Sequence, residues 1–277
     1  MKVYVSFDME GCSGIAYKAQ VGHNDSAPTA YSRAQRFATD DVKAAVEGVL
    51  EFEPDAEIWF NDAHGMSMNV FFEELPESVL SVVGSAELMD EVLGIDETFD
   101  AYICVGAHGN NMTQNAILSH VWDVREVCFN NRPLTETGLN AALAGFYGIP
   151  LVAMSGDEAS INAIKKELGT DIPSAVVKKG LGRYSAVCLH PKKAQKLIKE
   201  AVISGLKQRH NIPPLTFKNP ITVDLIHHDH FNAFAQKFFV PSDESLSPMH
   251  TRFIASDARD AYFGFLARDK LSKARHN

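Results

Sequence analysis

The feature that most constrains the fold is an alternation along the chain between short apolar runs and longer stretches with helical periodicity. The runs are rich in Val, Ile, Phe and Tyr, and their length suits buried strands. They lie at residues 2–8, 57–61, 101–106, 124–130, 150–155 and 221–226, and helical patterns lie at 31–52, 136–147, 159–168 and 191–209. Strands and helices that alternate in this way build a mostly parallel sheet flanked by helices. The sequence therefore predicts an α/β fold.

A proline-bearing segment divides the sequence into two unequal parts. It covers residues 207–219 and is followed directly by Pro220. A chain of 277 residues has room for one large domain or two smaller ones. We expect an α/β domain over residues 1–206 and a smaller C-terminal α+β portion over 207–277, which would serve in oligomerisation or in forming a pocket. An amphipathic helix is expected near the end of the chain, over residues 256–273.

The charge balance narrows the class of partner. Asp and Glu number 35 against 26 Lys and Arg, a net charge of −9, and no basic run interrupts this balance. Such a surface argues against nucleic acid and anionic membranes and favours a small molecule or a peptide. No apolar stretch approaches the roughly 20 residues that span a bilayer, so a cytoplasmic protein is expected. The four cysteines show no CxxC pairing and are predicted to be free structural thiols.

Four of the apolar runs end in residue types that bind metal ions. In parallel sheets, ligands bind in the crevice beyond the carboxyl ends of the strands. The four endings are Asp8-Met9-Glu10-Gly11, Asn61-Asp62-Ala63-His64, Gly106-Ala107-His108 and Ser155-Gly156-Asp157-Glu158. One such ending is ordinary, because polar residues cap most strands. Four of them in one α/β chain favour a metal site over a solvated rim.

Spacing supports the first of these endings in particular. Residues two apart in extended backbone project to the same side, which brings the carboxylates of Asp8 and Glu10 together and calls for a cation between them. The alternative is that Glu10 turns out to solvent. His64 and His108 stand a few residues beyond their strands, where loop backbone can aim an imidazole into the same crevice. Taken alone, either histidine is more often a hydrogen-bonded surface or core residue than a metal ligand. Mixed imidazole and carboxylate ligation favours zinc, with manganese or another divalent ion as alternatives.

These residues also carry a family resemblance. Ser6-Phe7-Asp8-Met9-Glu10-Gly11 resembles the SxDxEG opening of the zinc metallopeptidase family typified by the dipeptide-operon D-aminopeptidase. Segments at 61–64, 106–108, 119–120, 131–140 and 155–158 resemble later motifs of that family, in the same order. The resemblance extends from the N-terminus through about residue 194 and weakens beyond it.

The resemblance implies a role for each matching residue. Asp8 would bridge two zinc ions, with Glu10 and His64 on one ion and with His108 and Glu136 on the other. His120 matches the family's catalytic histidine. From the residues alone, Glu136 would complement a helix dipole and His120 would be a hydrogen-bonded core residue, so both of these roles depend on the resemblance.

By the same resemblance, the chain is expected to be a dinuclear zinc aminopeptidase, with the α/β domain as its metal-binding catalytic domain. Its substrates would be short peptides with an N-terminal D-amino acid, of the D-Ala-D-Ala type, hydrolysed by metal-activated water. The resemblance also implies a ring-like homodecamer that excludes folded proteins from its active sites. Two other functions stay open: a two-metal phosphoesterase, and a non-catalytic binding or assembly protein that retains a metal site.

Three features are left without an assigned role, and the sequence does not identify the substrate-binding residues. Cys12 stands where an aliphatic residue is more usual in the family; a small core residue is favoured over a metal-binding thiol. His227-His228-Asp229-His230 follows a predicted strand, and a polar strand-to-helix loop is favoured over a pocket wall or metal site. Three basic residues in a family-like segment are candidates for binding a substrate carboxylate, although Lys and Arg in a loop are usually only solvated: Lys178, Lys179 and Arg183.

Overall fold

The computed structural model describes residues 1–22, 27–84 and 91–273. Its main sheet has seven strands in the order β3-β2-β1-β4-β7-β8-β9, parallel except for the final β8–β9 hairpin. The strands are β1 (Lys2–Phe7), β2 (Glu57–Asp62), β3 (Val79–Val82), β4 (Ala101–Ala107), β7 (Leu151–Asp157), β8 (Ser174–Gly182) and β9 (Ser185–Cys188). The predicted α/β class is confirmed.

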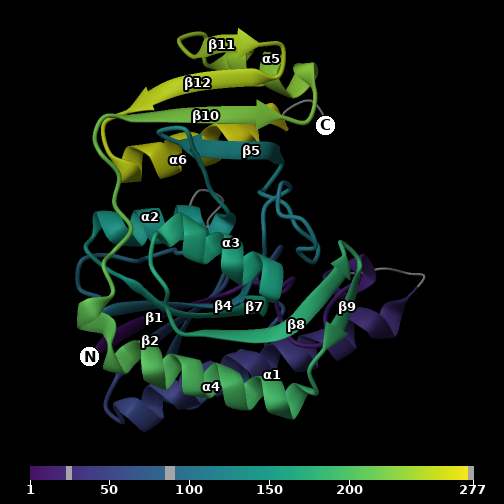
Figure 1. Ribbon diagram of the computed structural model, residues 1–277, viewed down its shortest axis with the longest axis vertical. Coiled ribbons are helices and arrows are strands. Elements are labelled where there is room, and N and C mark those ends of the chain that lie inside the picture. The colour runs from purple at the N-terminus through teal and green to yellow at the C-terminus, as the bar shows by residue number, and fades with distance from the viewer. Residues whose placement is uncertain (23–26, 85–90, 274–277) are drawn as a thin grey trace.

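Helices cover both faces of this sheet (Figure 1). The paired helices α1 (Pro28–Phe52) and α4 (Pro191–Lys207) cover one face, and α2 (Glu136–Phe146) and α3 (Glu158–Leu168) cover the other. Each of the first two begins with a proline, which suits a first helical turn because its N–H has no helical partner there. Within the described ranges, every helix is too short or too polar to cross a membrane.

A second sheet, of five antiparallel strands, lies above the α2 side of the first (Figure 1). Its order is β11-β12-β10-β5-β6, built from β5 (Val124–Phe129), β6 (Arg132–Pro133), β10 (Ile221–His227), β11 (Glu244–Ser247) and β12 (His250–Ala255). Helix α6 (Ala258–Ser272) packs between this sheet and α2, and α5 (His230–Phe239) packs on α6. Short 3₁₀ turns lie at Lys18–Gln20, Phe72–Glu74 and Arg209–Asn211.

The second sheet combines strands from distant parts of the sequence. Its strands β5 and β6 precede residue 206, and β10 to β12 follow it, so the sheet draws on both sides of the expected boundary at 206/207. The boundary itself stays a prediction. Periodicity located β5 and β10 but could not tell that they pair with each other in antiparallel register. It did not predict the long strand β8, the strand β12, the shorter strands or α5.

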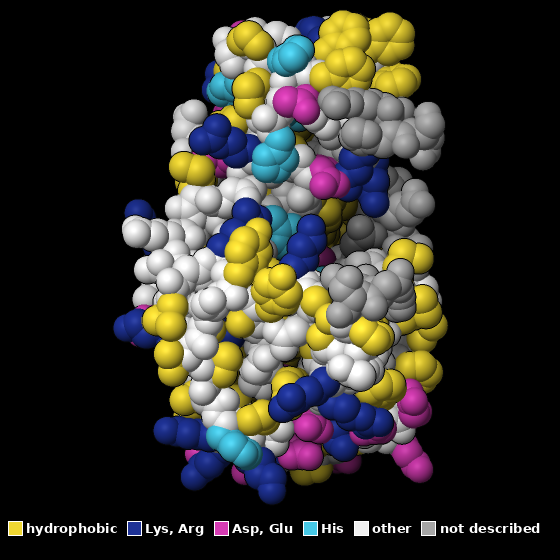
Figure 2. Space-filling view, turned by 90° about the vertical axis from the view of Figure 1, so that its right-hand side faces the viewer, with side chains coloured by type: hydrophobic (Ala, Val, Ile, Leu, Met, Phe, Trp, Pro, Cys, Tyr) yellow, Lys and Arg dark blue, Asp and Glu magenta, His cyan; other side chains and the backbone are white. Residues whose placement is uncertain are grey.

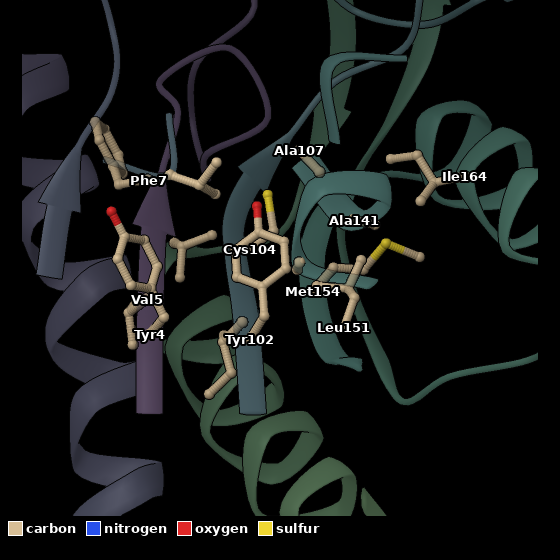
Figure 3. Packing of buried hydrophobic residues seen from close by; sticks show 14 of the residues in the cluster. Tyr4, Val5, Phe7, Tyr102, Cys104, Ala107, Ala141, Leu151, Met154 and Ile164 are labelled. Carbon is tan, nitrogen blue, oxygen red and sulfur yellow. The ribbon is translucent and has the colours of Figure 1, made fainter. Parts of the chain in front are cut away.

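The core is continuous across the main sheet. Strands β4 and β7 are buried along their whole length, as expected for parallel strands covered on both faces. Figure 3 shows Tyr4 of β1 and Tyr102 of β4 side by side, with their ring centroids 6.3 Å apart. The Tyr102 hydroxyl is hydrogen-bonded to that of Ser6 at 2.8 Å, which satisfies a polar group inside the core. All four cysteines are free, as predicted, and only Cys188 is exposed.

Candidate metal and catalytic centre

Neighbouring strand ends bring the predicted ligands together. Strands β2, β1 and β4 are adjacent and parallel, so their carboxyl ends share one edge of the sheet. His64 Nδ1 lies 3.0 Å from Asp8 Oδ1 and 3.0 Å from Glu10 Oε2. His108 Nε2 lies 2.9 Å from Asp8 Oδ2 and 3.1 Å from Glu136 Oε2. Asp8 therefore lies between the two imidazoles and presents one carboxylate oxygen to each.

A glycine allows the loop after β1 to approach the end of β4. The backbone N–H of Gly11 donates to the carbonyl of Gly106 at 2.8 Å. Gly106 has a φ of +84°, and a Cβ at this position would lie 1.8 Å from the carbonyl oxygen of Asp8. Only glycine accommodates this backbone contact, which holds the Asp8 loop against the strand that precedes His108.

The tautomers of the two histidines fit a cation between them and the carboxylates. His64 Nε2–H donates to the carbonyl of Val21 at 2.7 Å, and His108 Nδ1–H donates to the carbonyl of Gly109 at 3.0 Å. The other nitrogen of each ring therefore faces the carboxylate oxygens, and in the neutral ring that nitrogen carries a lone pair that can bind a metal ion. Either a proton on each ring or a metal ion between ring and carboxylates supplies the positive charge that these carboxylates attract. Backbone carbonyls commonly orient metal-binding histidines in this way.

An unsatisfied acceptor supports the same conclusion. Glu10 Oε2 is buried and accepts no hydrogen bond from the described residues. A buried carboxylate oxygen without a donor is costly unless a cation binds it. Two overlapping sets of possible metal ligands have all their donor atoms within 4.8 Å of one another: Asp8, Glu10 and His108, and His108, His120 and Glu136. This mixed donor set suits zinc.

The carboxylates and imidazoles of the cluster shift one another's pKa values. Burial raises the pKa of Asp8, but His108 and His64 outweigh it and hold that pKa well below its usual range. At Glu136, burial is outweighed by His120 and His108, and the pKa is lowered to about 2. Burial lowers the pKa of His64 and His108, yet the carboxylates raise both well above the usual value. The carboxylates are thus ionised and attract positive charge.

His120 is adjacent to the ligands and is not a core residue. Its side chain is 36% exposed, and Nε2 lies 3.8 Å from Glu136 Oε1. Its Nδ1–H donates to the carbonyl of Leu118 at 2.9 Å, which leaves the Nε2 lone pair of the neutral ring for chemistry. Leu118 and Trp122 on either side have positive φ, 51° and 40°, a strained conformation for large side chains. Such strain is often found at functional sites.

A buried lysine holds the loop that carries Asp8 and Glu10. Lys178 Nζ donates to the carbonyls of Glu10 at 2.5 Å, of Cys12 at 2.8 Å, and of Ile15. The side chain is 2% exposed and cannot reach a substrate, so Lys178 is neither a binder of a substrate carboxylate nor a solvated loop residue. The ammonium group instead binds the backbone of the ligand loop.

The other side of this loop contacts Asp41. Its carboxylate accepts from the N–H and the hydroxyl of Ser13, at 2.7 and 2.8 Å. Cys12 between these contacts is fully buried, and burial, followed by the charge of Asp41, raises the pKa of its thiol. The interpretation of Cys12 as a small core residue agrees with this position.

The strand ending at residues 155–158 lies apart from the cluster of predicted metal ligands. Asp157 instead caps α3, because its side chain accepts from the N–H groups of Ala159 and Ser160. Glu158 is paired with Lys179 instead, at 3.2 Å. This ending was expected to add to the metal site, and that expectation is wrong.

The histidine-rich run joins β10 to α5, as the favoured interpretation expected. His227 is buried at the end of β10 and is hydrogen-bonded to Thr251 at 3.0 Å. Asp229 caps α5, because its side chain accepts from the backbone N–H groups of Phe231 and Asn232. The run belongs to the second sheet and not to the cluster of ligands.

Sequence reasoning missed one acidic residue near the ligands. Glu91 lies in the wall of the hollow that contains Asp8, His64 and Glu136. It is 7% exposed and accepts a hydrogen bond from Asn140 Nδ2. No apolar run precedes Glu91, so the strand-end rule could not find it.

At the waist of the molecule, imidazole, Lys and Arg side chains gather around a hollowed surface (Figure 2).

Known proteins resemble this chain over its whole length. A family model described as D-aminopeptidase matches residues 1–267. D-aminopeptidase of Bacillus subtilis (strain 168) is 27% identical over 274 residues, which cover 98% of each chain. A solved structure, the Zn-dependent D-aminopeptidase DppA from Bacillus subtilis, a self-compartmentalizing protease, matches with a TM-score of 0.92 at 27% identity and 100% coverage of both chains. The resemblance drawn from the motifs is confirmed, and the likeness continues well beyond residue 194.

Proposed function

The chain belongs to the D-aminopeptidase family of peptide hydrolases, and we propose that it is a dinuclear zinc aminopeptidase. Its substrates are short peptides with an N-terminal D-amino acid, such as D-Ala-D-Ala. One observation carries the proposal: two imidazoles, each oriented by a backbone carbonyl, direct their free nitrogens at the two oxygens of Asp8. The zinc dependence of the structurally similar D-aminopeptidase supports the choice of metal.

The geometry supports one ligand set for each ion. Asp8 would bridge the two ions, since its Oδ1 faces His64 and its Oδ2 faces His108. Glu10 would complete the ligand set on the His64 side, and Glu136 would complete it on the His108 side. Neither half has enough ligands without Asp8, so we expect the two ions to bind as a pair.

The chain's own residues supply binding and proton transfer. Zinc held by this ligand set supplies Lewis acidity, which activates water and polarises a carbonyl group. His120 takes a proton at Nε2 from the attacking water and returns it to the leaving amine, while its Nδ1–H stays on the Leu118 carbonyl. Glu136, with Oε1 3.8 Å from His120 Nε2, stabilises the imidazolium that forms.

The protein is proposed to act as a ring-like homodecamer in the cytoplasm. The solved relative is a self-compartmentalizing protease, which supports an assembly of many copies. Enclosed active sites would admit only short peptides. Light scattering at micromolar protein concentration tests the assembly, and the mass of a monomer would reject it.

Elemental analysis coupled to turnover tests the function. We expect two zinc ions per chain and hydrolysis of D-Ala-D-Ala in preference to L-Ala-L-Ala. An aminoacyl anilide and an aryl phosphate are the paired controls, because a two-metal phosphoesterase would cleave the phosphate and spare the anilide. A protein replete with metal that cleaves no member of a dipeptide panel would instead be a binding or assembly protein.

A further inference from the structure

Two hollows meet at His120, and their walls differ in charge. The first, of about 320 Å³, has four acidic residues in its wall, Asp8, Glu91, Asp123 and Glu136, of which Asp8 and Glu136 belong to the proposed ligand set. The second, of about 270 Å³, has two cationic residues in its wall, Lys18 and Arg183. We call them the acidic hollow and the basic hollow. A short peptide ends in a carboxylate, and a cationic wall suits that group.

Other charged groups line both hollows. Lys270 and Lys273 also line the acidic hollow, and Lys273 forms ion pairs with Asp123 and Asp269. Glu10 is the carboxylate that lines the basic hollow, and it is directed at His64 within the proposed ligand set.

Arg183 is held in place beside His120. It lies at the turn of the β8–β9 hairpin, and its carbonyl accepts from the N–H of Leu118 at 2.8 Å. Its Nη2 donates to the carbonyl of Ser119 at 2.6 Å, one residue before His120. The guanidinium group also lies 5.6 Å from the centre of the Tyr184 ring. Backbone and side chain together position the cation in the wall of the basic hollow.

The guanidinium group keeps most of its binding capacity. Among the described residues, no carboxylate forms an ion pair with Arg183 of the kind that occupies Lys179. A guanidinium has five N–H donors in a fork that matches a carboxylate. Of the three basic residues that the sequence raised as candidates, Lys178 is buried and Lys179 is paired, which leaves Arg183.

We propose that Arg183 binds the C-terminal carboxylate of the substrate and thereby makes the enzyme selective for dipeptides. This inference rests on the proposed function. In a dipeptide the carboxylate lies one residue, about 3.5 Å of extended chain, beyond the scissile carbonyl. With the scissile bond at His120, the carboxylate reaches the basic hollow and Arg183. A longer peptide would place an uncharged amide beside Arg183.

Binding of two non-hydrolysable probes tests this assignment. Both are D-Ala-D-Ala with the peptide carbonyl reduced to a methylene, one with a free carboxylate and one with a C-terminal amide. Calorimetric titration of the zinc-loaded wild-type protein should show about tenfold tighter binding of the carboxylate probe. The charge-assisted hydrogen bonds between Arg183 and the carboxylate account for a difference of this size. Arg183→Met should remove this preference. Lys179→Met, in the same hairpin but outside the hollow, should keep it.

Arg183→Lys retains the charge but not the fork, and should keep part of the preference; zinc content and melting temperature establish that each variant is folded. The assignment is overturned if neither probe binds, if the wild type binds both equally, or if the preference survives in Arg183→Met. Turnover of D-Ala-D-Ala by the wild type is measured separately. A carboxylate preference without turnover would refute the proposed function and leave the carboxylate site intact.

Discussion

His108 and His120 stack with their rings nearly parallel, at a centroid distance of 4.4 Å and an interplanar angle of 7°. The two rings differ in surroundings. His108 is 1% exposed and lies between Asp8 and Glu136, whereas His120 is 36% exposed and lies on the open side of the stack. One ring therefore suits metal binding and the other suits proton transfer to a substrate.

Replacing His120 separates these two roles. His120→Ala should keep its zinc and lose about 10² to 10⁴ in kcat, the range of general acid–base catalysis. His108→Ala is the matched control and should lose zinc. Metal content, melting temperature and kcat are measured on one preparation of each variant. Loss of zinc from His120→Ala would make His120 a ligand, and near-normal kcat would leave it without a catalytic role.

Asp8→Ala should weaken the binding of both metal ions, because each half of the centre loses a ligand. We expect zinc affinity to fall by more than about 100-fold. This exceeds the loss that usually follows when a residue hydrogen-bonded to a metal ligand is removed, because here a ligand itself is lost. Competition against a chromogenic chelator measures both sites. Asp55→Ala, in an exposed turn, is the control for removing a carboxylate. Two equivalents of zinc bound at wild-type affinity would show that Asp8 is not the bridge.

Lys178→Met should reduce zinc affinity about 10- to 100-fold, since the loop that carries Asp8 and Glu10 loses its ammonium partner. Lys179→Met removes the exposed neighbouring lysine and should change nothing. Zinc competition and thermal unfolding of the metal-free protein are measured together. A lower melting temperature with unchanged zinc affinity would limit Lys178 to a structural role.

Asp41→Asn should change how stability depends on pH. Burial, opposed by the hydrogen bonds from Ser13, raises the pKa of Asp41 to about 6. The folded protein therefore holds this proton more tightly than the unfolded chain, and wild-type stability falls as pH rises from about 4 to about 6. An amide cannot ionise, yet it can accept from the Ser13 N–H and donate to its hydroxyl.

The variant should gain roughly 2 to 3 kcal/mol over the wild type between pH 4 and pH 7. Urea unfolding of both proteins at a series of pH values, with a chelator present, measures this difference. A difference in unfolding free energy that stays constant with pH would mean that Asp41 titrates normally.

Local sequence predicted four of the seven strands of the main sheet and most of the proposed metal ligands. Short apolar runs located β1, β2, β4 and β7 to within a few residues, because strands that are covered on both faces bury nearly every side chain. The strand-end rule then identified Asp8, Glu10, His64 and His108, since neighbouring parallel strands always end at the same edge. The roles of Glu136 and His120 came from the family resemblance, because each residue alone fits an ordinary helix start or core position.

Tertiary structure decided how distant segments combine. The three basic residues Lys178, Lys179 and Arg183 are close in sequence, yet one is buried on loop carbonyls, one is paired with Glu158 and one lines a hollow. The pairing of β5 with β10 and the position of Glu91 depend in the same way on contacts between segments far apart in the chain. The local sequence pattern indicates which side chains of an element are buried. The packing of the whole chain decides which distant segment contacts them.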